Sequence, residues 1–183
     1  MARVHLVKAA RKAIPEAGIV KGEPYYWWKF RYGGKRVSKT PPKRSQLTQS
    51  DFYARLWDIE DDVVSQAEAN SDLASVRDDV VSQLQELRDE TEEKLNNMPE
   101  GLQQGSTGEL LQERIDALES AIDEYEGLEL EEPSDDDLNL DDERNEDETE
   151  EEFTTRIEEE REQAVQEYWE GKLSEFQDIS VSA

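Results

Sequence analysis

The chain has 183 residues, of which 34% are hydrophobic and 37% are charged, and its formal net charge is -26. This composition favours small cores and long solvent-exposed helices over one large hydrophobic core. The absence of cysteine excludes disulfides and thiolate metal sites and suits a reducing compartment. No apolar run reaches membrane length and the N-terminus lacks a signal-peptide pattern, so we expect a soluble, cytoplasmic protein.

The charge is divided unevenly along the chain. Residues 1–50 contain twelve Lys or Arg and two acids, whereas residues 51–183 contain nine Lys or Arg and 45 acids, so the two parts carry +10 and -36. Such asymmetry usually marks segments with different partners. The predicted parts are a basic aromatic β module at 1–47, an acidic helical hairpin at 48–127, an acidic linker at 128–148 and an amphipathic helix at 149–178.

The basic module is predicted to be a small antiparallel sheet. The run Arg3 to Lys8 alternates in polarity and can form one strand, and two further alternating runs flank Gly33-Gly34. Glycines suit a tight hairpin turn because they adopt positive φ without steric cost. A turn at these glycines gives the pairs Tyr32–Lys35, Arg31–Arg36, Phe30–Val37 and Lys29–Ser38.

Strand alternation would separate the side chains of this hairpin onto two faces. The expected core face carries Tyr26, Trp28, Phe30, Tyr32 and Val37, and the expected outer face carries Tyr25, Trp27, Lys29, Arg31, Arg36 and Ser38. Cations with exposed rings are typical of nucleic-acid contact. The predicted DNA- or RNA-binding residues are Tyr25, Trp27, Lys29, Arg31, Arg36, Lys39, Lys43 and Arg44. An alternative stays open, in which the rings only stabilise the sheet and the cations are solvated or contact the acidic helices.

A helix is predicted after the sheet. Pro41-Pro42 ends the last strand and Thr48 can cap a helix whose apolar residues recur at helical spacing, namely Phe52, Leu56, Ile59 and Val63. We expect the start of this helix to cover the aromatic core face, because two strands alone are marginally stable in water.

Two resemblances concern this part of the chain. The order strand, aromatic strand, "GGKR" turn, cationic strand and helix is similar to the arm-type DNA-binding domain of phage integrases, which implies a small sheet that contacts DNA. The string "YYWWKFRYGGKRVSKTPPKRSQLTQSDF" resembles a group of uncharacterised small proteins of tailed bacteriophages. That resemblance implies a phage origin, and hence the cytoplasm of an infected bacterial host, but no known activity. The recombinase's catalytic residues have no counterpart, since His5 is the only histidine.

Two long helices are predicted in the acidic part. The first starts near Ser71, carries Leu73, Val76, Val80, Leu84 and Leu87 at spacings of three and four, and ends near Met98-Pro99 before a loop "EGLQQGSTG". The second begins with a capping pattern of Ser106 and Glu109, and heptad spacing follows at Leu111, Ile115, Leu118, Ile122 and Tyr125. A connection this short favours an antiparallel helical hairpin.

A last helix is predicted from the capping pattern of Thr149 and Glu152, with Phe153, Ile157, Ala164, Val165, Tyr168, Leu173 and Phe176 on one side. The whole chain is therefore expected to be α+β, with a small N-terminal sheet followed by a helical hairpin or a three-helix bundle or coiled coil. Self-association into a homo-oligomer is left open.

Residues 129–152 hold fifteen acids and the single base Arg144, which is typical of a disordered linker. The alternative is a calcium loop of the EF-hand type, with ligands at Asp135, Asp137, Asn139, Glu143 and Glu146. Leu140 stands where that loop needs glycine, so we expect no calcium site.

No residue constellation points to catalysis: there is one histidine, and the chain has no glycine-rich phosphate loop and no "HExxH" motif. We therefore expect no enzyme, no cofactor and no metal. The preferred function is a phage accessory protein that binds DNA or RNA through its basic module and a host or phage protein through its acidic helices. One alternative is a DNA mimic that inhibits a host defence or DNA-binding protein. Another is an acidic coiled-coil scaffold.

Overall fold

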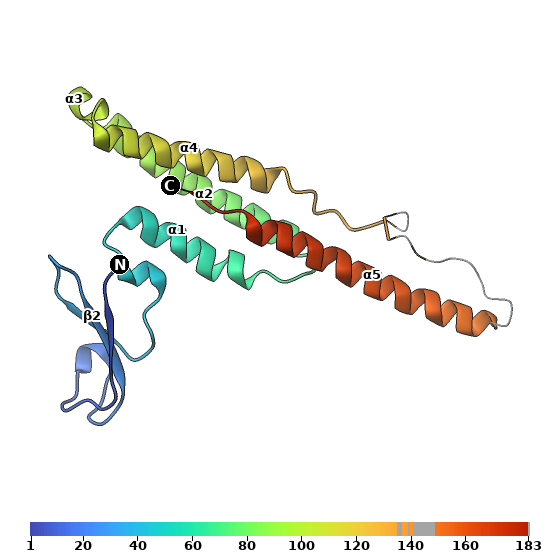
Figure 1. The fold of residues 1–183 in the computed structure, drawn as a ribbon, viewed down its shortest axis with the longest axis horizontal. Coiled ribbons are helices and arrows are strands. Elements are labelled where there is room, and N and C mark those ends of the chain that lie inside the picture. Colours follow the sequence, from blue (N-terminus) through green and yellow to red (C-terminus); the bar gives the residue numbers. More distant parts are fainter. Residues whose placement is uncertain (135–136, 139, 141–148, 183) are drawn as a thin grey trace. The chain divides into compact units, whose positions relative to one another are not determined.

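The computed structural model describes residues 1–134, 137–138, 140 and 149–182 (Figure 1). The chain divides into two compact units, Met1–Glu60 and Asp61–Ala183. The first contains a three-stranded antiparallel sheet and the second consists of helices, which confirms the α+β class. The boundary between the units lies after Glu60, within the helix at 51–62, whereas the basic β module was predicted to end at residue 47.

The sheet has the strand order β1-β2-β3, with β1 at Val4–Val7, β2 at Tyr25–Lys29 and β3 at Lys35–Ser38. The predicted third strand is confirmed. Between β1 and β2 the chain makes a 3₁₀ turn, η1 at Pro15–Ala17, and returns to the sheet. The N–H group of Ala10 donates to the carbonyl of Glu23 at 2.8 Å, so antiparallel pairing continues beyond the strands.

The first unit has its own core. Its buried apolar residues come from the β1–β2 connection, the hairpin and helix α1 at Asp51–Asp62; they are Ala10, Ile19, Trp28, Phe30, Phe52, Leu56 and Ile59. The Trp28 ring is 3% exposed and its Nε1–H donates to the carbonyl of Gln46 at 3.1 Å, in the 3₁₀ turn η2 at Arg44–Leu47. At the start of α1 it is the Ser50 hydroxyl, not that of Thr48, which accepts the Tyr53 N–H.

The predicted register of the hairpin is wrong. The observed pairs are Lys29–Lys35, Trp28–Arg36, Trp27–Val37 and Tyr26–Ser38, so the connection is the five-residue segment 30–34. Phe30 is buried and Gly33 donates its N–H to the Phe30 carbonyl at 3.3 Å, so the chain turns at Phe30, before the two glycines.

A shift of the pairing by an odd number of residues moves side chains of β3 to the opposite face. Val37 therefore joins Trp27 on the outer face, and Arg36 joins Trp28 on the other face. Tyr32, expected in the core, is 84% exposed in the connection. Of the side chains predicted for the core face, only the rings of Trp28 and Phe30 are buried.

The second unit is built on a hairpin of α2 at Leu73–Asn96 and α4 at Ser106–Glu126, which lie side by side (Figure 1). The seam between them buries the predicted apolar residues Val80, Leu84, Leu87, Ile115, Leu118 and Ile122. The predicted loop contains one short helix, α3 at Glu100–Gln103. The capping pattern of Ser106 and Glu109 is not formed, since Gly105 occupies the N-cap and Ser106 is the first helical residue.

The last helix, α5 at Glu150–Asp178, begins with the predicted capping box. The Thr149 hydroxyl accepts the Glu152 N–H at 3.3 Å, and the Glu152 carboxylate accepts the Thr149 N–H at 3.0 Å. Only Trp169, which the apolar pattern missed, and Phe176 are buried in this helix. The Phe176 ring packs edge-on against Tyr125 of α4 at 5.1 Å between centroids, so the C-terminal third of α5 joins the hairpin.

Candidate nucleic-acid interface

The outer face of the sheet is an aromatic cluster covered by one lysine. Cross-strand pairing aligns His5, Trp27 and Val37 in one row. The His5 ring lies parallel to the Trp27 ring at 4.3 Å and 12°, and the Lys35 ammonium lies over the same ring at 4.6 Å. No ammonium fits between two rings stacked at that distance, so His5 and Lys35 cover opposite faces of the indole. Trp27 thus offers an edge, not an open face for base stacking.

Tyr25 is the second ring of this cluster. Its centroid lies 5.8 Å from the Lys35 ammonium, and its side chain is half-buried. Lys35 therefore contacts both predicted outer-face rings through cation–π attraction. The sequence prediction did not include Lys35, because the assumed register placed it beside the turn.

Lys29 and Lys35 lie directly opposite each other at the end of the hairpin where the connection 30–34 begins. Like charges at directly paired positions destabilise a sheet. Both side chains are exposed, and neither forms an ion pair with a residue that the structure describes. No acidic residue occurs between Glu23 and Asp51 to neutralise them. An anion bound between the two ammonium groups would relieve their repulsion.

The connection between β2 and β3 adds two arginines and an exposed ring. The Arg31 guanidinium lies 5.3 Å from the centroid of the Tyr32 ring, and the Arg36 guanidinium lies 5.4 Å from the buried Phe30 ring. We call the exposed group Lys29, Arg31, Tyr32, Lys35 and Arg36 the hairpin tip. The two arginines, like the two lysines, form no ion pair with a described residue.

Three of the predicted binding cations lie away from the tip. Lys39 forms an ion pair with Glu23 at 3.2 Å, and Arg44 forms one with Glu60 while lying over the Trp57 ring at 5.1 Å. Lys43 precedes η2, and its backbone N–H donates to Gln46 Oε1 at 3.2 Å. Lys39 and Arg44 therefore stabilise the first unit through its own carboxylates.

The carboxylate of Glu23 is held by two partners. It accepts the N–H of Val20 at 2.9 Å and the Lys39 ammonium. The backbone hydrogen bond first, and the lysine second, lower the pKa of Glu23 below its ordinary value. Glu23 thus stays ionised and keeps Lys39 engaged at all but acidic pH.

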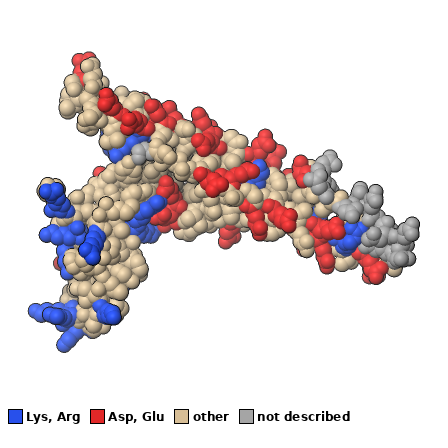
Figure 2. All heavy atoms as spheres, in the orientation of Figure 1, with Lys and Arg blue, Asp and Glu red and all other residues tan. Residues whose placement is uncertain are grey.

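Charge is segregated between the two units. Figure 2 shows Lys and Arg gathered over the first unit and Asp and Glu over the helices of the second. Residues 150–167 of α5 alone contain eight Glu and two Arg, and none of these residues is buried. This stretch is therefore an acidic helical surface with a net charge of -6.

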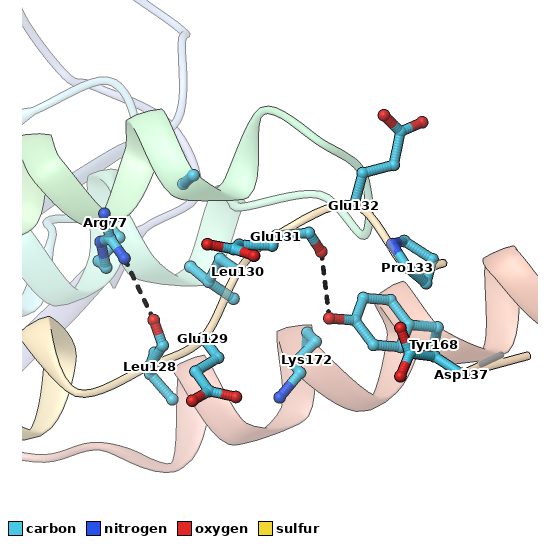
Figure 3. Close-up of a pocket in the computed structure, with 11 residues that line it drawn as sticks. Arg77, Leu128, Glu129, Leu130, Glu131, Glu132, Pro133, Asp137, Tyr168 and Lys172 are labelled. Atoms are coloured by element: carbon cyan, nitrogen blue, oxygen red, sulfur yellow. Dashed lines mark hydrogen bonds between the residues drawn. The ribbon is translucent and has the colours of Figure 1, made fainter. Parts of the chain in front are cut away.

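A pocket of ≈ 820 Å³ lies in the second unit, between α2, α5 and the chain that follows α4 (Figure 3). Arg77 Nη1–H donates to the carbonyl of Leu128 at 3.1 Å and the Tyr168 hydroxyl donates to that of Glu131 at 3.1 Å. These side chains fasten the chain after α4 to two helices. The polar groups of Arg77 and Tyr168 that face this chain are thus engaged with backbone carbonyls.

No group of three or more His, Asp or Glu side chains is placed to hold a metal ion within the described part of the chain. Of the predicted calcium ligands, Asp135, Asn139, Glu143 and Glu146 lie outside the described residues. Among the helices that the structure describes, none combines the length and apolar character needed to span a membrane.

Comparison of the chain with protein-family models, with curated proteins and with solved structures finds no significant match. Function must therefore be argued from the residues and their geometry alone.

Proposed function

We propose that this protein is a non-enzymatic accessory protein that binds nucleic acid through the hairpin tip of its first unit and a basic protein through the acidic helices of its second. The observation that carries the first part is the Lys29–Lys35 pair, two exposed lysines placed at directly opposite positions by the strand register. Two like charges at paired positions destabilise the sheet. A phosphate bound by the two lysines would offset this repulsion.

The surroundings of the pair support a phosphate ligand. The two lysines project on one face of the hairpin, Arg36 projects on the other, and Arg31 lies in the connection between them. A nucleic-acid backbone presents phosphates at regular short intervals, so one strand crossing the tip can contact several of these cations. Ring contact by Tyr32 would add a term that does not depend on salt.

The acidic stretch at residues 150–167 supports the protein partner. A helix this polar gains little from packing within its own chain, yet Thr149 and Glu152 cap its start with reciprocal hydrogen bonds. Its net charge of -6 favours a basic protein surface and disfavours self-pairing of the same helix. The same stretch fits the alternative of a DNA mimic, whose target would be the DNA-binding surface of another protein.

The proposal is tested by a titration of the full chain against a fluorescein-labelled oligonucleotide at several salt concentrations. Replacing Lys29→Glu together with Lys35→Glu should weaken binding at least about tenfold and lower the salt slope by about two. The double variant keeps two like charges opposite each other but removes the Lys35 ammonium from the Trp27 and Tyr25 rings, so circular dichroism first establishes that its sheet is folded.

Lys8→Glu together with Lys12→Glu is the matched control. It changes the net charge by the same amount, but these lysines lie beyond the end of β1 that pairs with Tyr25, at the opposite end of the sheet from the tip. If the control loses as much affinity as the tip variant, binding is diffuse and the tip is not the site. In a pull-down from bacterial lysate with and without nuclease, partners that are lost on nuclease treatment are expected only of the nucleic-acid-binding function, because a mimic recovers the same protein in both samples.

A further inference from the structure

Resting on the proposed function, we infer that the hairpin tip selects unpaired bases, and hence single-stranded over double-stranded nucleic acid, with Tyr32 as the stacking ring. Tyr32 is 84% exposed, and every other aromatic side chain that the structure describes is half-buried or buried. The Arg31 guanidinium lies over one face of this ring, 5.3 Å from its centroid, so the opposite face is the one open to a base. A base stacked on Tyr32 would bring its own phosphates within reach of the flanking cations.

The other rings of the sheet cannot do this. Trp27 has His5 over one face and Lys35 over the other, and Tyr25 shares the same lysine. Trp28 and Phe30 are buried, and Tyr26 is half-buried on the same side of β2 as Trp28. The sheet therefore offers one open aromatic face, and it lies at the end of a narrow hairpin.

One open ring at a tip discriminates between the two forms of nucleic acid. In a duplex each base face is covered by its stacked neighbours, so a ring reaches a base only after unstacking, which costs free energy. In a single strand the base faces are accessible, and base–aromatic stacking is tolerant of sequence. The cations contribute to both forms, whereas Tyr32 contributes to the single strand.

The tip is held in place before any ligand binds. Phe30 is buried at the first position of the connection, and Gly33 donates its N–H to the Phe30 carbonyl at 3.3 Å. Gly33 also packs closely on this ring residue, since a Cβ at position 33 would lie 3.3 Å from Phe30 Cβ. A connection anchored in this way loses little conformational entropy on binding, so Tyr32 is presented in a fixed direction.

The test uses the full chain at low salt with three labelled probes of equal length: an oligothymidylate, an oligouridylate and a DNA duplex. Tyr32→Ala should weaken binding of the single strands about tenfold, the loss expected from one stack, and change duplex binding by less than about twofold. Tyr32→Phe keeps the ring and should restore single-strand binding. Comparison of the two single strands identifies the natural ligand as DNA or RNA.

Tyr32→Lys separates stacking from charge. It adds a cation at the tip, so a purely electrostatic surface would bind every probe more tightly, whereas stacking predicts a lower ratio of single-strand to duplex affinity. Leu6→Ala, at an exposed apolar side chain of β1, is the control and should leave that ratio unchanged. Equal affinity of the parent for single strand and duplex, or equal losses in Tyr32→Ala, would overturn this inference alone. A parent chain that binds none of the probes would overturn the proposed function itself.

Discussion

The two units of this protein carry opposite charge and arrange it by different means. In the second unit the acids follow helical periodicity, which spreads them over the surface of α2, α4 and α5 and away from the seam. In the first unit the cations are brought together by pairing between strands, which sets Lys29 against Lys35. Charge on a helix is thus distributed by local sequence, whereas charge on a sheet is concentrated by contacts between segments.

The largest effect is expected from removing one buried aromatic ring from the core of a single unit. Trp28→Ala removes a buried ring and its hydrogen bond to the Gln46 carbonyl, and should destabilise the first unit by about 3–5 kcal/mol. Phe176→Ala is the counterpart in the second unit, where that ring is 0% exposed. Denaturant unfolding followed by far-UV circular dichroism and by tryptophan fluorescence should show one altered transition in each variant. Loss of both transitions in either variant would mean that the two units do not fold independently.

A smaller effect is expected from separating the charges. A fragment of residues 1–69 carries +5, against -26 for the full chain, and it contains the whole core of the first unit. Because the acidic remainder repels phosphate and competes for the cations, the fragment should bind an oligonucleotide about tenfold more tightly at low salt. Circular dichroism first establishes that the fragment is folded. If fragment and full chain bind with equal affinities that do not depend on salt, the acidic part does not compete with nucleic acid for the cations.

The smallest effect concerns the ion pair that keeps Lys39 away from the tip. The pKa of Glu23 is lowered in the folded protein by the Val20 N–H and by Lys39, so its contribution to stability is present above the ordinary carboxyl pKa and is lost as the pH falls through the lowered value. Glu23→Gln keeps an acceptor for the Val20 N–H but removes the charge. At neutral pH the melting temperature of the variant should be slightly lower than that of the parent. In acid the two melting temperatures should be equal. A difference in melting temperature that persists in acid would show that the charge is not its cause.

The sequence predicts the helical part of this fold well because its signals are local. Spacings of three and four residues placed the seam of α2 and α4, and the pattern of Thr149 and Glu152 located the start of α5. The sequence prediction was wrong where a local pattern is compatible with more than one structure. Gly105 caps α4 in place of Ser106, and Trp169 lies outside the simple apolar stripe of α5 but is buried by its neighbours.

The candidate site shows the opposite balance. Composition alone established a basic, aromatic, acid-free segment and three strands, and it identified Lys29, Arg31 and Arg36 as exposed cations. Which side chains share a face was decided by the register, because the side-chain period of a strand is two and an odd shift exchanges the faces of β3. The register in turn depends on burial of Phe30, which draws the chain out of the ladder before the glycines. Lys35 and Tyr32 therefore become candidate binding residues only in the tertiary structure. The residues next to Phe30 in the sequence do not predict its burial, because the core that buries this ring is formed by residues distant in the chain.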